Sequence, residues 1–106
     1  MLTDALAHVA ERAPRVYLTV DIDVLDPAFA PGTGTPEPGG LTTRELLRAV
    51  RRIAAELDLV AMDIVEVAPP YDHASVTAMA GHRVVLETLS GMALRKSGRA
   101  ARAERP

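Results

Sequence analysis

The sequence contains no cysteine or tryptophan, and among its 106 residues only three are aromatic and one is lysine. Without cysteine, the chain has no disulfide, no thiolate nucleophile and no cysteine-ligated zinc. No apolar run approaches the ~20 residues that a membrane-spanning helix needs. The first residues also lack the basic segment and apolar core of a signal peptide. These absences predict a cytoplasmic protein of at most one domain, with no membrane partner.

The net charge of −2 is unevenly distributed along the chain. Residues 95–106 carry five basic residues against one acidic residue, which leaves a charge of −6 for the rest. We expect residues 96–106 to form a basic, disordered tail, because large apolar groups are rare there. The arginines are not interleaved with stacking aromatic residues, which argues against a nucleic-acid partner.

The spacing of apolar residues predicts alternating helices and strands. The first expected element is a short helix with a possible cap at Thr3 or Asp4 that ends before Pro14. It is followed by a strand at 16–20, a helix that starts at the capping box of Thr42 and Glu45, a strand at 59–67 and a helix at 76–94. The second helix is expected to bury Leu46, Leu47, Val50, Ile53, Ala54 and Leu57. The third helix is expected to turn inward Met79, Leu86, Leu89 and Met92.

Both strands are apolar on both faces, which is typical of a parallel sheet with flanking helices. The predicted fold class is therefore α/β, with the second helix as a right-handed crossover between the strands. Two strands alone do not make a stable sheet, so we expect further strands from another chain or from a larger protein. Residues 26–40 include four prolines and four glycines, which predicts a long ordered loop.

Two aspartates, Asp21 and Asp23, follow the first strand, and no lysine or arginine occurs between Val16 and Thr43. Residues i and i+2 of a strand project from the same face, and α/β sheets bind ligands where parallel strands end. Two close carboxylates repel each other unless a cation lies between them. Oxygen ligands favour manganese or magnesium over zinc. The pair therefore predicts a metal site.

Other interpretations of the aspartate pair are simple loop capping, a calcium-binding EF-hand and a phosphatase of the haloacid-dehalogenase type. An EF-hand needs glycine at the sixth loop position and glutamate at the twelfth, but Asp26 and Gly32 stand there. The phosphatase needs a lysine near its nucleophilic aspartate, and the only lysine, Lys96, lies in the expected tail. Both of these alternatives fit poorly.

Two longer stretches carry a resemblance to a known family. They are TVDIDVLDPAFAPGTGTPEPGG, residues 19–40, and MDIVEVAPPYD, residues 62–72. Together they resemble the manganese-dependent ureohydrolases, the family of arginases, agmatinases and guanidino-acid hydrolases, and PPYDHASVT looks more like agmatinase than arginase. The resemblance implies that residues 1–95 are the C-terminal portion of an arginase-like three-layer αβα fold.

The resemblance also implies roles for individual residues. Asp21 would bridge two manganese ions, Asp23 would bind one of them, and Glu66 would hold the substrate guanidinium through paired hydrogen bonds. A hydroxide bound to the two manganese ions would attack the guanidinium carbon and release urea and an amine. The pocket residues would be Thr33, Thr35 and His73. The implied substrate is agmatine, with arginine or another guanidino acid as the alternative.

Two further aspartates are expected to be structural. We expect Asp26 to hydrogen-bond the loop backbone, because Pro27 follows it and it lies off the i, i+2 face. Asp63 stands three residues before Glu66, so we expect it to point to the opposite face and make a structural polar contact.

The family's remaining metal ligands, an upstream histidine and an upstream D-A-H-x-D motif, have no counterpart in this sequence. His8 and His82 are expected on helix surfaces. We therefore expect the chain to supply part of the site without a catalytic residue of its own and to be inactive alone. Its partners would be a small guanidino substrate and either the missing N-terminal portion of the same enzyme or further copies in a homo-oligomer. The alternative is a non-catalytic module that keeps the ureohydrolase fold for association only.

Overall fold

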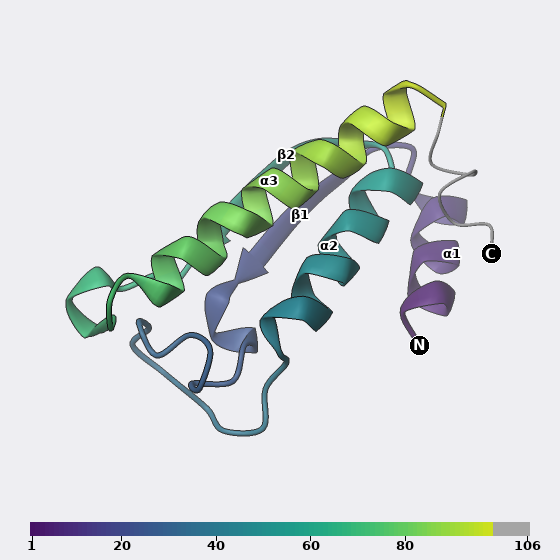
Figure 1. Cartoon of the computed structure of the whole chain (residues 1–106). Helices are drawn as coiled ribbons and strands as arrows, with labels where there is room; N and C mark the ends of the chain where they lie inside the picture. Colours follow the sequence, from purple (N-terminus) through teal and green to yellow (C-terminus); the bar gives the residue numbers. More distant parts are fainter. Residues whose placement is uncertain (99–106) are drawn as a thin grey trace.

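The computed structural model describes residues 1–98, and these follow the expected order of helix, strand, helix, strand and helix (Figure 1). The elements are α1 Leu2–Arg12, β1 Val16–Asp21, α2 Thr43–Glu56, β2 Leu59–Val65 and α3 Val76–Lys96, with short 3₁₀ turns at Ile22–Val24 and Pro69–Tyr71. The α/β class is confirmed. Lys96, the first residue of the expected tail, ends α3, and residues 99–106 of that tail lie outside the described residues.

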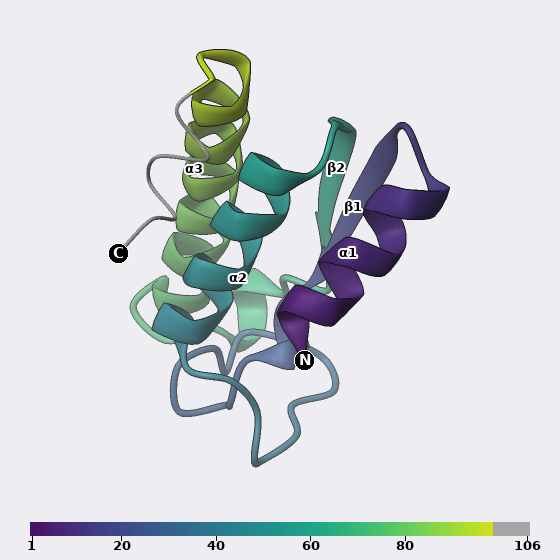
Figure 2. The ribbon, with the colours of Figure 1, turned by 90° about the vertical axis from the view of Figure 1, so that its right-hand side faces the viewer.

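β1 and β2 pair in parallel, with α2 as the connection between them. Leu18 lies opposite Met62, and Val20 lies opposite Ile64. These four side chains point toward the same side of the sheet and pack there in the main core. Figure 2 shows α2 and α3 together on that side of the strands.

The main core lies between this sheet face and the two helices α2 and α3. Its buried members are Val20, Ile22, Leu25, Ala30, Leu46, Val50, Ala80 and Val84. Burying one large aliphatic side chain of this kind stabilises a fold by about 1.5–3 kcal/mol. A second, smaller cluster joins α1 to the end of α2 and to the beginning of both strands.

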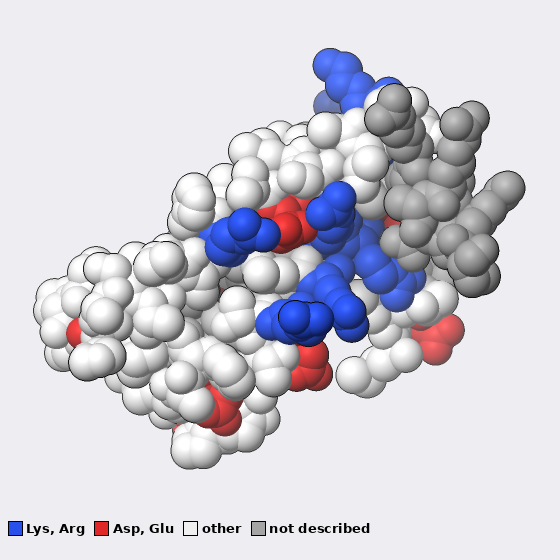
Figure 3. Space-filling model, viewed as in Figure 1, with Lys and Arg blue, Asp and Glu red and all other residues white. Residues whose placement is uncertain are grey.

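Helix α2 begins at the predicted capping box. The Glu45 backbone N–H donates to the Thr42 hydroxyl at 3.1 Å, and the Thr42 N–H donates to the Glu45 carboxylate at 3.0 Å. The expected apolar stripe of α2 is buried or half-buried. On the outer surface, Arg51 of α2 and Arg83 of α3 both pair with Glu87 at 3.0 Å. Figure 3 shows several basic side chains close to acidic ones on this side of the molecule.

The buried face of α3 differs from the prediction. Three side chains expected to point inward are exposed, namely Met79, Leu86 and Leu89. The face that is buried is made mostly of small residues: Thr77, Ala80, Gly81, Val84, Thr88 and Gly91. A Cβ atom at Gly91 would lie 2.7 Å from the Cβ of Ala54, so α2 and α3 approach too closely for large side chains to fit between them. The prediction from hydrophobicity was therefore wrong for Met79, Leu86 and Leu89. The fourth residue expected to point inward, Met92, is half-buried.

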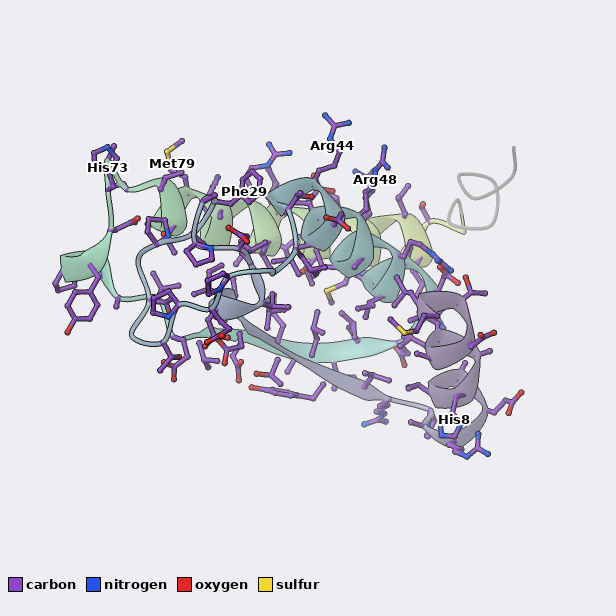
Figure 4. The ribbon with its side chains drawn as sticks, turned by 90° about the horizontal axis from the view of Figure 1, so that it is seen from below. His8, Phe29, Arg44, Arg48, His73 and Met79 are labelled. Carbon is purple, nitrogen blue, oxygen red and sulfur yellow. The ribbon has the colours of Figure 1, made fainter. Side chains whose placement is uncertain are left out.

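The other face of the sheet is open. Within residues 1–98, no helix or strand covers this face, and Figure 4 shows side chains of the strands projecting from it. Tyr17, which points that way, is 55% exposed. The described residues thus form one helix layer and a sheet, two of the three layers of the expected fold. No helix in this range combines the length and the apolarity needed to cross a bilayer.

Candidate metal and substrate site

Asp21 and Asp23 lie close together at the end of β1. The strand ends at Asp21, and a 3₁₀ turn follows at Ile22–Val24. The Asp23 backbone N–H donates to Oδ1 of Asp21 at 3.1 Å, so Asp21 caps the turn. The strand alternation on which the prediction depended does not extend to Asp23. The capping turn, and not a shared strand face, brings the two residues together.

Asp21 lies near two other carboxylates, those of Asp23 and Glu66. Partial burial raises the pKa of Asp21 above its ordinary value, and the negative charges of Asp23 and Glu66 raise it further. The hydrogen bond from the Asp23 N–H acts in the opposite direction but does not cancel these effects. A divalent cation at this point would relieve the repulsion.

Glu66 immediately follows β2, whose last residue, Val65, lies opposite Asp21. Glu66 is therefore at the same rim of the sheet as the aspartates. Its backbone φ of 71° lies in the left-handed region, which costs a residue with a Cβ atom of order 1–3 kcal/mol. Residues held in such conformations cluster at functional sites. The side chain of Glu66 is exposed.

The loop after the aspartates contacts them. The Thr35 hydroxyl donates to Oδ2 of Asp23 at 2.9 Å, so Thr35 touches a candidate metal ligand directly. Thr33 is only 3% exposed, and its hydroxyl has no hydrogen-bond partner within the described residues. No hydrogen bond of the Thr33 side chain within the described residues ties it to the carboxylates, so its role as a pocket residue stays a prediction.

Asp26 and Asp63 are structural, as predicted. Asp26 accepts two loop N–H groups at 2.9 Å, and these bonds lower the pKa of Asp26. Asp63 lies on the open sheet face, where it accepts the hydroxyl of Thr19 at 2.6 Å and the hydroxyl of Tyr17. Both hydroxyl groups lower the pKa of Asp63. Neither carboxylate belongs with Asp21, Asp23 and Glu66 at the rim of the sheet.

No histidine joins the carboxylates. Figure 4 places His8 on α1 and shows His73 near the start of α3, with its ring pointing away from the strands. His82 is exposed on α3. The structure therefore does not bring His73 toward Asp21 and Asp23. Within residues 1–98, no three acidic or histidine side chains form a group that could hold a metal ion. A metal at this rim would need ligands from elsewhere.

Asp72 and Thr77, which the sequence pattern did not single out, tie the loop to α3. The Thr77 hydroxyl accepts the Gly32 N–H at 2.8 Å, and Asp72 accepts N–H groups from the first turn of α3. An aspartate just before a helix is a common cap, so a signal for Asp72 was present. No sequence pattern pairs Thr77 with a glycine 45 positions earlier.

A hollow of about 620 Å³ lies far from these carboxylates, at the end of the sheet where β2 begins. Its walls come from the last turn of α2, the start of β2 and the last turns of α3. It lies at the opposite end of β2 from Glu66, so it is not connected to the rim. The candidate site is the rim, where Asp21 and Val24 line part of a smaller hollow of about 290 Å³.

The chain is an α/β protein with carboxylates at the ends of two adjacent parallel strands, the edge at which such sheets commonly bind ligands. The arginase family matches residues 1–91. The chain therefore belongs to the arginase family, and the resemblance of residues 19–40 and 62–72 is confirmed.

A comparison with three relatives shows how much of their length this chain covers. The chain is 53% identical over 95 residues to an agmatinase from Photorhabdus laumondii, which covers 88% of this chain and 31% of the agmatinase. A hypothetical agmatinase from Burkholderia thailandensis is 42% identical, with a TM-score of 0.78 over 92% of this chain and 31% of its own. Formimidoylglutamase from Bacillus subtilis is 40% identical, with a TM-score of 0.84 over 88% and 29% of the two chains. The chain thus spans about a third of the length of these relatives.

Proposed function

We propose that this chain supplies part of the active site of a ureohydrolase that cleaves agmatine, or another guanidino compound, to urea and an amine. The observation that carries this proposal is the meeting of Asp21, Asp23 and Glu66 at one rim of the sheet, where their charges interact. Similarity to agmatinases supports agmatine as the substrate. Formimidoylglutamase is similar to the same region, so the shared fold alone does not select the substrate.

Manganese fits the donor set of this rim. Carboxylate oxygens are the ligands that manganese and magnesium prefer, and a cation would relieve the repulsion that raises the pKa of Asp21. Asp21 would hold two ions and Asp23 one of them, while the Thr35 hydroxyl fixes one oxygen of Asp23. When bound, such ions lower the pKa of water and so supply the nucleophile.

Glu66 would bind the guanidinium group. A carboxylate accepts two parallel N–H bonds from this planar cation, and the left-handed backbone of Glu66 turns the chain at the end of β2. From this position, Glu66 would orient the guanidinium carbon toward the aspartates. Fixed orientation of the reacting groups accounts for a large part of the rate that such a site achieves.

The proposal can be tested in a chimera in which residues 1–95 replace the matching part of the Photorhabdus laumondii agmatinase. We expect the chimera with manganese to release urea from agmatine, and the 106-residue chain alone to release none. Glu66→Gln should keep the manganese content and lower kcat/KM by about 100-fold or more, because a charge-assisted pair is lost. Asp23→Asn should lower the manganese content itself, as measured by metal analysis.

Glu37→Gln is the matched control, because Glu37 is an exposed carboxylate in the loop that follows Asp23. It should change neither the manganese content nor kcat/KM. If Glu66→Gln loses manganese as readily as Asp23→Asn, Glu66 belongs to the metal shell and its proposed role is wrong. Urea released only from arginine or a guanidino acid would correct the substrate. A chimera that binds manganese but hydrolyses none of these compounds would favour the association module, for which the open sheet face is the supporting observation.

A further inference from the structure

Gly32 makes two hydrogen bonds with residues that follow it in the sequence by more than 30 positions. Its N–H donates to the Thr77 hydroxyl at 2.8 Å, and its carbonyl accepts the N–H of Ala68 at 2.7 Å. The first bond reaches the first turn of α3, and the second reaches the segment that follows β2. Gly32 therefore fastens the loop after the aspartates to both.

Asp72 completes this arrangement. It accepts the N–H groups of His73 at 2.9 Å, Thr77 at 3.0 Å and Ala78 at 3.1 Å. Partial burial would raise the pKa of Asp72, but the Thr77 side chain and these backbone N–H bonds lower it overall. The Thr77 hydroxyl accepts from Gly32, and the Thr77 backbone N–H donates to Asp72, so Thr77 contacts both Gly32 and Asp72.

The packing around Gly32 is tight. A Cβ atom at this position would lie 2.8 Å from Cβ and Cγ of Asp72, a separation that real Cβ atoms do not adopt. Gly32 is buried, and Thr77 is fully buried. The loop therefore cannot shift toward α3 without moving Asp72, and it cannot shift away without breaking the bond to Thr77.

Short links connect this arrangement to the candidate site. Thr35, three residues after Gly32, donates to Asp23. Ala68, bonded to the Gly32 carbonyl, lies two residues after Glu66. Pairing of β1 with β2 fixes the strands only as far as Asp21 and its partner. Beyond the strand ends, the hydrogen bonds of Gly32 join the loop after Asp23 to the segment after Glu66, and Ile22 and Val67 of the two segments also share the main core.

We propose that Thr77 and Asp72 are positioning residues that set the spacing between Asp23 and Glu66 by clamping Gly32. The inference rests on the proposed function, in which Asp23 binds a metal ion and Glu66 binds the guanidinium. Neither Thr77 nor Asp72 touches the substrate in this arrangement. They act through the loop and through the segment after β2.

Hydrogen exchange measured by mass spectrometry on the 106-residue chain tests the clamp directly. Thr77→Val keeps the shape of the side chain and removes the hydroxyl that accepts the Gly32 N–H. We expect residues 27–38 and 66–72 to exchange about three- to tenfold faster, as the loss of one hydrogen bond implies. Thr77→Ser should restore the slow exchange. Gly32→Ala, which presses on Asp72 from the loop side, should accelerate the same two segments.

Thr88→Val is the matched control. Thr88 is also fully buried on α3, but its hydroxyl donates to the Val84 carbonyl within the helix at 2.7 Å. This variant should leave both segments unchanged. If Thr88→Val accelerates them as much as Thr77→Val, or if Thr77→Val accelerates only α3, the clamp does not exist.

Manganese binding separates positioning from mere stability. The electron paramagnetic resonance signal of free manganese, titrated with the chimera that supplies the remaining ligands, should show binding weakened about three- to tenfold by Thr77→Val and unchanged by Thr88→Val. If Thr77→Val accelerates exchange but binds manganese normally, the clamp is structural and the positioning role is wrong. If the chimera and its Asp23→Asn variant give the same titration, the metal role in the proposed function fails, and the exchange data alone decide the clamp.

Discussion

The two faces of the β1–β2 sheet have opposite characters. Toward α2 and α3, Val20 and its neighbours pack into a core from which water is excluded. Toward the other side, Tyr17, Thr19 and Asp63 form a hydrogen-bonded polar row that stays largely exposed. The first face is complete within residues 1–98. The second face has satisfied polar groups, but nothing in the described range covers it.

This difference locates the candidate site at a boundary. Asp21 follows Tyr17 and Thr19 along the open face, whereas the loop after it is fastened to α3 on the covered side through Gly32. The carboxylates are therefore held from one side only. The other side is where further metal ligands would approach, which is the physical reason for expecting a partial site.

The largest effect is expected where the covered face is tightest. A Cβ atom at Gly91 would lie 2.7 Å from both the Ala54 Cβ and the Arg51 carbonyl oxygen, so Gly91→Ala must push α2 and α3 apart. We expect the free energy of unfolding to fall by about 2–3 kcal/mol, as for other overpacked sites, in urea denaturation followed by circular dichroism. Gly34→Ala is the control, since nothing lies within 4 Å of a Cβ there. Equal losses in both variants would mean that the helices are not closely packed.

The same contact shows what could and could not be predicted from sequence. The element order, the capping box of Thr42 and Glu45 and the apolar stripe of α2 follow local patterns, and the structure confirms them. The inner face of α3 does not follow such a pattern. Its residues were selected for small size against α2, and size complementarity between two helices cannot be seen in either helix alone.

The candidate site also combines residues that local patterns predict with contacts that they do not predict. Asp21, Asp23 and Glu66 were identified because a carboxylate at a strand end is a local signal combined with a family pattern. The contact of Thr35 with Asp23 and the bond of Gly32 to Thr77 depend on how the loop folds back over long sequence distances. Proline and glycine predicted an ordered loop, but they do not specify its partners.

A smaller effect, confined to the loop, is expected on acidification. Hydrogen bonds lower the pKa of Asp26 and Asp72 in the folded chain. Their stabilisation is therefore present above the ordinary aspartate pKa of about 3.9 and is lost as the pH falls through the lower folded values. Asp21 behaves oppositely, because its pKa is raised and protonation relieves repulsion.

Below about pH 4, residues 27–38 should therefore exchange hydrogen faster, after correction for the intrinsic pH dependence, while the second half of α3 stays protected. Asp26→Asn should weaken this acid response, because its side chain no longer gains or loses a proton. Simultaneous loss of protection in the loop and in α3 would show that the loop does not open separately from the covered face.

The smallest effect on stability is expected at the outer surface of α3, where the sequence placed core residues and the structure places exposed ones. Leu89 is 56% exposed, so Leu89→Gln should change the free energy of unfolding by no more than about 0.5 kcal/mol. Val84→Ala, on the buried face of the same helix, should cost about 2 kcal/mol through lost burial and a cavity. Leu89→Gln should also reduce self-association, measured by light scattering over a range of concentrations, because it interrupts an exposed apolar surface. Equal destabilisation at Leu89 and Val84 would mean that the outer surface of α3 is buried in the chain itself, and the contrast between covered and open surfaces would not hold for this helix.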